Sequence, residues 1–230
     1  MANCLKARPG QVALLKEQDQ EEFIGVAKLT NEREVRILRQ LQFLRGVVKI
    51  KMEKELEPDV HLLITHYAGQ DLKSYCLCRV GPGPPAMGIV VGLLTVVQNV
   101  HNAGFVHLDI KPANVVVPVN VTDTSAILLD FGLACSTEET LCGPTGTQGW
   151  MAPEVEELEE NEENEEIDLK LADIWSLGKV LLFMTDSCTF TEQEKDLAET
   201  LGKRMISVDP DERPSLADVL SQVWQMVGHL

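Results

Sequence analysis

The chain lacks several features that would assign it to a whole class of proteins. No apolar run approaches the ~20 residues of a membrane-spanning helix, and the N-terminal residues lack the apolar core of a signal peptide. Basic residues are outnumbered, because 20 Lys and Arg face 36 Asp and Glu, and the net charge is −16. Nucleic acids and anionic membrane surfaces attract basic patches, so this balance argues against both as partners.

Paired C-x-x-C zinc spacing is also lacking among the six cysteines. We therefore predict reduced thiols in a cytoplasmic protein, with a nuclear location left open. Cys135 and Cys142 lie close together in the sequence, and they are either an inert pair or a regulatory disulfide. The cysteines are Cys4, Cys76, Cys78, Cys135, Cys142 and Cys188.

The 230 residues suffice for one large domain or two lobes, and they contain no internal repeats. Alternation and turn residues predict strands at Cys4–Arg8, 12–16, 47–51 and 61–65, and a hairpin at 115–117 and 127–129. Apolar spacing predicts one helix from about Glu32, after an acidic stretch, and a long apolar helix over 87–101. A buried helix around Asp173 and two or three more helices are expected to end the chain.

The chemistry-bearing strings are His-Leu-Asp-Ile-Lys-Pro-Ala-Asn at residues 107–114 and Asp-Phe-Gly at 130–132. Phosphoryl transfer from a nucleotide needs a carboxylate near the attacking hydroxyl, a cation near the moving group and oxygen ligands for magnesium. Asp109, Lys111, Asn114 and Asp130 supply these groups. Either string alone is weak evidence, since Asp-Phe-Gly after a strand is also an ordinary turn.

Further strings follow in order and make the pattern specific. Residues 146–154 read Gly-Thr-Gln-Gly-Trp-Met-Ala-Pro-Glu, residues 173–178 read Asp-Ile-Trp-Ser-Leu-Gly, and residues 209–215 read Asp-Pro-Asp-Glu-Arg-Pro-Ser. Together with the first two strings, this order resembles the eukaryotic-type Ser/Thr protein kinases.

The resemblance implies an α+β fold of two lobes. Residues 1–66 would form a truncated N-lobe of strands plus one regulatory helix. Residues 67–230 would form a mainly helical C-lobe, with the catalytic loop, the activation segment and an acidic insertion over 155–168. The implied cofactors are ATP and Mg²⁺, and the implied substrate is a Ser or Thr hydroxyl of a protein. The acidic surface hints at a basic substrate, and the oligomeric state stays unknown.

The resemblance also assigns the catalytic and metal-binding roles. Asp109 would accept the proton of the substrate hydroxyl, and Lys111 would neutralise charge on the transferred group. Thr147 would brace both, while Asn114 and Asp130 would hold magnesium. Further along the chain, an ion pair between Glu154 and Arg213 is expected to be structural, and Asp173 is expected to tether the backbone of the catalytic loop.

The nucleotide phosphates would be contacted by a lysine paired with Glu34. Two lysines compete for this role. Lys28 lies too close to Glu34 along the chain for a strand, a loop and helical turns to fit between them, so it is expected to be a solvated lysine. The distance from Lys16 to Glu34 along the chain is similar to the family's, and Lys16 is therefore preferred.

Residues 65–72 are predicted to be the hinge that holds the adenine. The residue at its entrance is either Ile64 or Thr65, and Tyr67 follows within it. Asp71 lies where the family often contacts ribose. It is equally well placed to cap the next helix, and both roles are compatible.

The chain departs from the family in three ways that bear on activity. No G-x-G-x-x-G string precedes Lys16, so nucleotide binding should be weak and turnover slow. Leu108 stands where many relatives have an Arg that reads a phosphate, so activity should not need phosphorylation of the activation segment. The Glu-rich run up to Glu166 is either a solvated loop or an attractant for basic substrates. The alternative function is a pseudokinase or scaffold that binds protein partners.

Overall fold

The computed structural model describes residues 12–16, 23–78, 85–118, 126–139, 146–157 and 167–227. The strand predicted at Cys4–Arg8, Cys142 and most of the acidic run lie outside these residues. Within the described residues, no helix is both long and apolar enough to cross a membrane.

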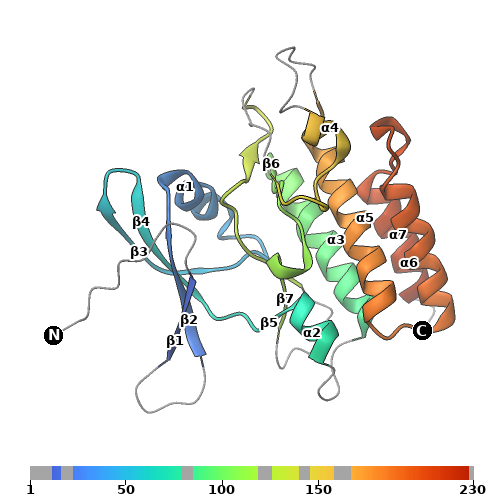
Figure 1. The fold of residues 1–230 in the computed structure, drawn as a ribbon, viewed down its shortest axis with the longest axis horizontal. Coiled ribbons are helices and arrows are strands. Elements are labelled where there is room, and N and C mark those ends of the chain that lie inside the picture. Colours follow the sequence, from blue (N-terminus) through green and yellow to red (C-terminus); the bar gives the residue numbers. More distant parts are fainter. Residues whose placement is uncertain are drawn as a thin grey trace.

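The N-terminal part is an antiparallel sheet of four strands in the order β1-β2-β4-β3 (Figure 1). Strand β1 (Val12–Lys16) confirms the prediction, and β4 (Val60–His66) and β3 (Ile50–Glu57) lie at or close to two others. Strand β2 (Phe23–Thr30) was not predicted. Its sequence shows no regular alternation of polar and apolar residues, which is the pattern that predicts a strand.

Helix α1 (Glu32–Leu41) follows β2 after a single residue, Asn31. The Asn31 side chain caps the helix by accepting a hydrogen bond from the backbone N–H of Glu34 at 3.0 Å. One face of the helix is buried and anchors it against the rest of the molecule; its apolar members are Val35, Ile37, Leu38 and Leu41. This direct strand-to-helix connection decides the geometry of the site.

The C-terminal part is mainly helical. Its longer helices are α3 (Ala86–Asn102), α5 (Leu169–Ser187), α6 (Glu192–Met205) and α7 (Leu216–Val227), which pack side by side in Figure 1. Helix α3 is buried on almost all sides, as its near-continuous apolar sequence predicts. The shorter helices are α2 (Leu72–Cys78), α4 (Pro153–Glu157), η1 (Pro112–Asn114) and η2 (Pro210–Glu212).

Short strands position the loops between the two parts. Strands β5 (Gln70–Asp71), β7 (Val115–Val117) and β8 (Ile127–Leu128) form one small sheet, and β6 (Phe105–Val106) pairs with β9 (Cys135–Ser136). Gly69 enters β5 with φ +133°, where an added Cβ would lie 2.5 Å from the carbonyl oxygen of Val117. Only glycine allows this approach of the hinge to β7.

A disulfide between Cys76 of α2 and Cys188, the residue after α5, corrects the prediction that the cysteines are all free thiols. The two cysteines are far apart in the sequence and carry no spacing motif. Their pairing follows from the packing of α2 beside the C-terminal end of α5, which only the tertiary structure supplies.

Candidate active site

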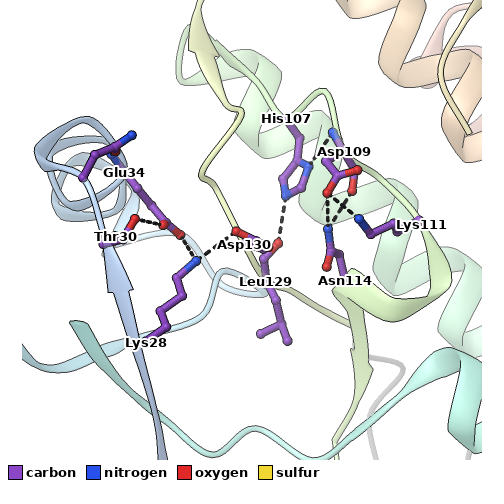
Figure 2. A network of polar contacts seen from close by, with 10 residues as sticks. Lys28, Thr30, Glu34, His107, Asp109, Lys111, Asn114, Leu129 and Asp130 are labelled. Carbon is purple, nitrogen blue, oxygen red and sulfur yellow. Dashed lines mark hydrogen bonds and ion pairs between the residues drawn. The ribbon is translucent and has the colours of Figure 1, made fainter. Parts of the chain in front are cut away.

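The carboxylate of Asp109 is the centre of a buried polar cluster on the loop before η1 (Figure 2). Its Oδ1 accepts a hydrogen bond from the Thr147 hydroxyl at 2.6 Å, and its Oδ2 accepts from the amide of Asn114 at 2.8 Å and from Lys111 Nζ at 2.7 Å. Lys111 Nζ also donates to Thr147 Oγ1 at 2.6 Å. These contacts hold Asp109 in one orientation beside a fixed cation.

Asp173 of α5 holds the backbone of this loop from behind and is fully buried. Its two carboxylate oxygens accept hydrogen bonds from the backbone N–H groups of His107 and Leu108, each at 2.8 Å, and His101 Nε2 lies 2.8 Å from Oδ2. Leu108 has φ +62°, a conformation that costs a residue with a side chain about 1 kcal/mol or more. Asp173 therefore stabilises a strained loop. We call Asp109, Lys111, Asn114, Thr147 and Asp173 the catalytic-loop network.

The pKa of Asp173 follows from these contacts. Burial alone would raise the pKa of this carboxyl group. The hydrogen bond from His101, electrostatic interactions with His101 and His107 and the backbone N–H of His107 outweigh burial, and they lower the pKa below its ordinary value of 3.8. The group is thus ionised at neutral pH despite its burial.

A second cluster, which we call the lysine network, joins β2, α1 and Asp130 (Figure 2). Lys28 Nζ lies 2.6 Å from Glu34 Oε1 and 2.9 Å from Asp130 Oδ1. The Thr30 hydroxyl donates a short hydrogen bond to the other Glu34 oxygen. The Glu34 side chain is only 2% exposed, whereas that of Asp130 is 48% exposed. The network thus runs from a buried helix position to an open carboxylate.

The lysine prediction was wrong, because the partner of Glu34 is Lys28. Lys16 ends β1 and its Nζ lies 4.7 Å from the centre of the Phe23 ring, an exposed cation–π contact outside the site. The expectation failed because it assumed a loop between the lysine strand and the helix. Asn31 alone separates β2 from α1, so the first turn of the helix brings Glu34 directly to Lys28.

The charges of the lysine network support one another. Burial would lower the pKa of Lys28, but the carboxylates of Glu34 and Asp130 outweigh it and raise that pKa above 10.5. Burial would likewise raise the pKa of Asp130, yet the charge and hydrogen bond of Lys28 lower it below 3.8. At neutral pH the site therefore presents a firmly charged cation and carboxylate.

A cavity of about 450 Å³ opens between the sheet and the small β5–β7–β8 sheet, a size that suits a small ligand. Its wall includes Thr65, Tyr67 and Asp71 of the predicted hinge but not Ile64. Ile64 pairs with Ala27, and because strand side chains alternate, it faces away from Val26 and Lys28. The structure thus selects Thr65 of the two candidates.

The remaining walls of the cavity carry the charged groups. Lys28, Glu34, Asn114 and Asp130 all line it, so the cavity joins the lysine network to the catalytic-loop network. Asp71 Oδ1 accepts from the backbone N–H of Ser74 at 2.9 Å, so Asp71 begins α2 as its cap while it also lines the cavity. The helix cap and a place in the cavity wall, the two predictions for Asp71, are therefore compatible.

Asn114 and Asp130 are suited to hold a cation together. The Asn114 amide nitrogen donates to both the backbone oxygen and Oδ2 of Asp109, which leaves its amide oxygen as the ligand atom. Among the described residues, no group of three or more His, Cys, Asp or Glu side chains could hold a metal ion. Magnesium fits such a pair, because it binds through one or two protein oxygens and completes its shell with phosphates and water.

Two further contacts shape the C-terminal part, and the first is the predicted ion pair of Glu154 and Arg213. Arg213 forms a paired hydrogen bond with both Glu154 oxygens, at 2.6 and 2.7 Å, and its guanidinium lies over Trp175. The His107 ring packs edge-on against Phe131, and its Nε2 bonds the Leu129 carbonyl oxygen at 2.9 Å. His107 is therefore a packing residue of the loop.

Comparison with known families matches residues 1–200 of the chain to the protein kinase domain. The chain belongs to the protein kinase domain family. Its fold is the kinase fold, with an N-terminal antiparallel sheet plus a helix and a mainly helical C-terminal part. This agrees with the α+β fold class that the motifs predict.

The relatives of this kinase domain are Ser/Thr kinases. Calcium-dependent protein kinase 27 of Arabidopsis thaliana is 29% identical over 245 residues, which cover 93% of this chain and 47% of that protein. Serine/threonine-protein kinase DCLK3 of Mus musculus is 25% identical over 98% of this chain and 31% of its own length. The chain thus spans less than half the length of either relative.

The prediction that the Gly-rich loop is missing concerns residues ahead of Val12, which lie outside the described residues. With the lysine now placed at Lys28, glycine occurs ahead of it only at Gly10 and Gly25, so no G-x-G-x-x-G string precedes it. Strand β1 is the neighbour of the lysine strand, and the residues before Val12 are not described. The weak nucleotide binding inferred from this absence stays a prediction.

Proposed function

We propose that this kinase domain transfers a phosphoryl group from magnesium-bound ATP to a Ser or Thr hydroxyl of a protein. The observation that carries the proposal is the double role of Asn114. Its side chain lines the cavity and also donates to the Asp109 carboxylate at 2.8 Å. A nucleotide in the cavity would therefore have its phosphates beside a positioned base.

The division of labour follows from the contacts. Asp109 orients the substrate hydroxyl and accepts its proton, for which an ionised carboxylate held by Thr147 and Asn114 is suited. Lys111 keeps a positive charge next to Asp109, where negative charge develops on the transferred group. Lys28, fixed by Glu34, is placed to contact the nucleotide phosphates.

Asn114 and Asp130 would hold magnesium, which when bound neutralises charge on the phosphates. Lys28 and Asp130 are in contact, so the cation on the strand and the metal ligand stand side by side at the cavity wall. We also propose that residues 1–66 and 67–230 act as two lobes, with the cavity between them as the nucleotide site.

The substitution Asp109→Asn tests the catalytic role. It keeps the side-chain shape and removes the base, so phosphate transfer to a generic basic protein should fall at least about a hundredfold while ATP binding persists. Radiolabel transfer measures the first quantity and calorimetry the second. Equal activity in the variant and the wild type would contradict the assignment.

The same calorimetry separates the kinase from its alternative. Magnesium-dependent ATP binding should be measurable and should be largely removed by Asp130→Ala, because Asp130 is a metal ligand in this proposal. A wild-type protein that binds no nucleotide at millimolar ATP would instead act as a scaffold for protein partners.

A further inference from the structure

Glu139 connects the segment that follows Asp130 to helix α1. Its Oε2 lies 3.0 Å from a terminal nitrogen of Arg33, and its Oε1 lies 3.6 Å from one of Arg36. Arg33 precedes Glu34 by one residue and Arg36 follows it by two. One carboxylate from a distant segment therefore binds two residues of the helical turn that carries Glu34, the partner of Lys28. Among the described residues, Arg33 Nε is buried without a hydrogen-bond partner, and the contact to Glu139 is made by the terminal nitrogen.

The base of this contact is fixed to the C-terminal part. Strand β9 pairs with β6, and the backbone N–H of Thr137 donates to the Gly104 carbonyl at 2.9 Å. The backbone N–H of Glu139 in turn donates to the Ser136 carbonyl at 3.0 Å. Glu139 thus reaches α1 from a backbone that the β6–β9 pair and two further hydrogen bonds hold in place.

The catalytic loop itself offers no charged contact to this segment at Leu108. Leu108 is buried in an apolar cluster that takes in both ends of the segment, with Cys135 at its start and Met151 and Ala152 at its end. Apolar packing around Leu108 and the hydrogen bonds of Thr147 to Asp109 and Lys111 therefore hold the segment at the catalytic loop, while the carboxylate of Glu139 holds it at α1.

We propose that Glu139 is a positioning residue for the lysine network. Through Arg33 and Arg36 it holds α1 in the position where Glu34 meets Lys28, so the site is assembled without a charged modification of the segment. This inference rests on the proposed function for its effect on catalysis, whereas its effect on α1 is a property of the fold alone.

The test compares Glu139→Gln with the matched control Glu138→Gln. Glu138 is exposed, and the described contacts give its side chain no ion pair. Hydrogen–deuterium exchange of α1 reports helix position without any need for activity. Steady-state kinetics report kcat and the KM for ATP and peptide.

Glu139→Gln should speed exchange in α1 and lower kcat roughly two- to fivefold, a size that suits partly exposed ion pairs. The KM for peptide should stay unchanged, because Glu139 contacts α1 and not the catalytic loop. Arg33→Gln should have a larger effect than Arg36→Gln, given the shorter contact. The charge-exchanged pair Glu139→Arg with Arg33→Glu should recover part of the loss, and high salt should weaken the wild-type effect.

If Glu139→Gln and Glu138→Gln have the same exchange in α1, the proposal is wrong. If exchange differs but kcat does not, Glu139 positions the helix without serving catalysis, which also overturns it. A wild-type protein without phosphate transfer would contradict the proposed function. The exchange experiment would then still decide whether Glu139 holds α1.

Discussion

The catalytic-loop network and the lysine network differ in the parts of the molecule from which their members come. Asp109, Lys111 and Asn114 belong to one short loop, and Asp173 anchors that loop from a buried helix. Lys28 and Asp130 meet across a separation of 102 positions, from a strand of the N-terminal sheet and a loop of the C-terminal part.

The geometry of the two networks therefore depends on different features of the structure. The catalytic-loop network is built within one part of the molecule, so its geometry depends on local backbone and on burial. The lysine network depends on how the N-terminal sheet and α1 sit against the C-terminal part. Substitution of the buried anchor Asp173 in the first network should alter folding, whereas substitutions in the second should alter catalysis with a smaller effect on folding.

The largest effect is expected from Asp173→Asn. Two backbone N–H donors need two acceptors, and asparagine offers one oxygen, so the variant leaves a buried donor unsatisfied. We expect a loss of about 3 to 5 kcal/mol in the free energy of unfolding, as for other broken buried pairs. Urea unfolding at pH 7 measures this free energy. An unchanged midpoint would contradict the expectation that the catalytic-loop network depends on Asp173 for folding.

The pH dependence of this loss can also be derived. The folded pKa of Asp173 is lowered below 3.8, so its ionised form stabilises the protein fully above that value and loses its effect as the pH falls through the folded pKa. The difference between wild type and Asp173→Asn should therefore narrow below pH 3.8. A constant difference down to strongly acidic pH would contradict the lowered pKa.

A hundredfold effect on activity is expected from Lys28→Met. Methionine keeps much of the side-chain volume but removes the cation that contacts Glu34 and Asp130, so phosphate transfer should fall about a hundredfold, as when other charge-stabilising groups are removed. Lys16→Met is the matched control, since Lys16 lies on the neighbouring strand outside the cavity. Equal losses of activity in both variants would contradict the choice of Lys28 over Lys16 as the lysine that contacts the nucleotide phosphates.

A smaller effect is expected from Thr147→Val. The variant removes a hydroxyl that donates to Asp109 and accepts from Lys111, and one such bond to a charged group corresponds to about a tenfold change in kcat. Thr147→Ser retains the hydroxyl and should stay near wild type. A valine variant as active as the serine variant would contradict the role of the hydroxyl.

The smallest effect is expected from treatment with a phosphatase. Leu108 packs in an apolar cluster and cannot bind a phosphate, so basal activity should change by less than about twofold. Kinetics before and after treatment, with mass spectrometry to verify the phosphorylation state, give the answer. A large loss would mean that a basic residue elsewhere reads a phosphate on this segment.

Much of the site was predictable because its chemistry is encoded in short strings. The placement of Asp109, Lys111 and Asn114 on one loop needs only their spacing, since neighbours along a loop are neighbours in space. Helix α3 was equally clear, because a long apolar run can only be buried. Strand β2 was missed, since its sequence shows no regular alternation of polar and apolar residues.

The sequence by itself indicated the family, and it supplied the candidates for the base and the metal ligands, because these depend on residue identity and order. Tertiary structure alone decided that Lys28 and not Lys16 meets Glu34, that Thr65 and not Ile64 faces the cavity, and that Cys76 joins Cys188. Each of these depends on where one element ends and how its side chains face another. Spacing along the chain does not fix the direction in which a side chain points. The one-residue connection at Asn31 and the register of β2 with β4 do fix it.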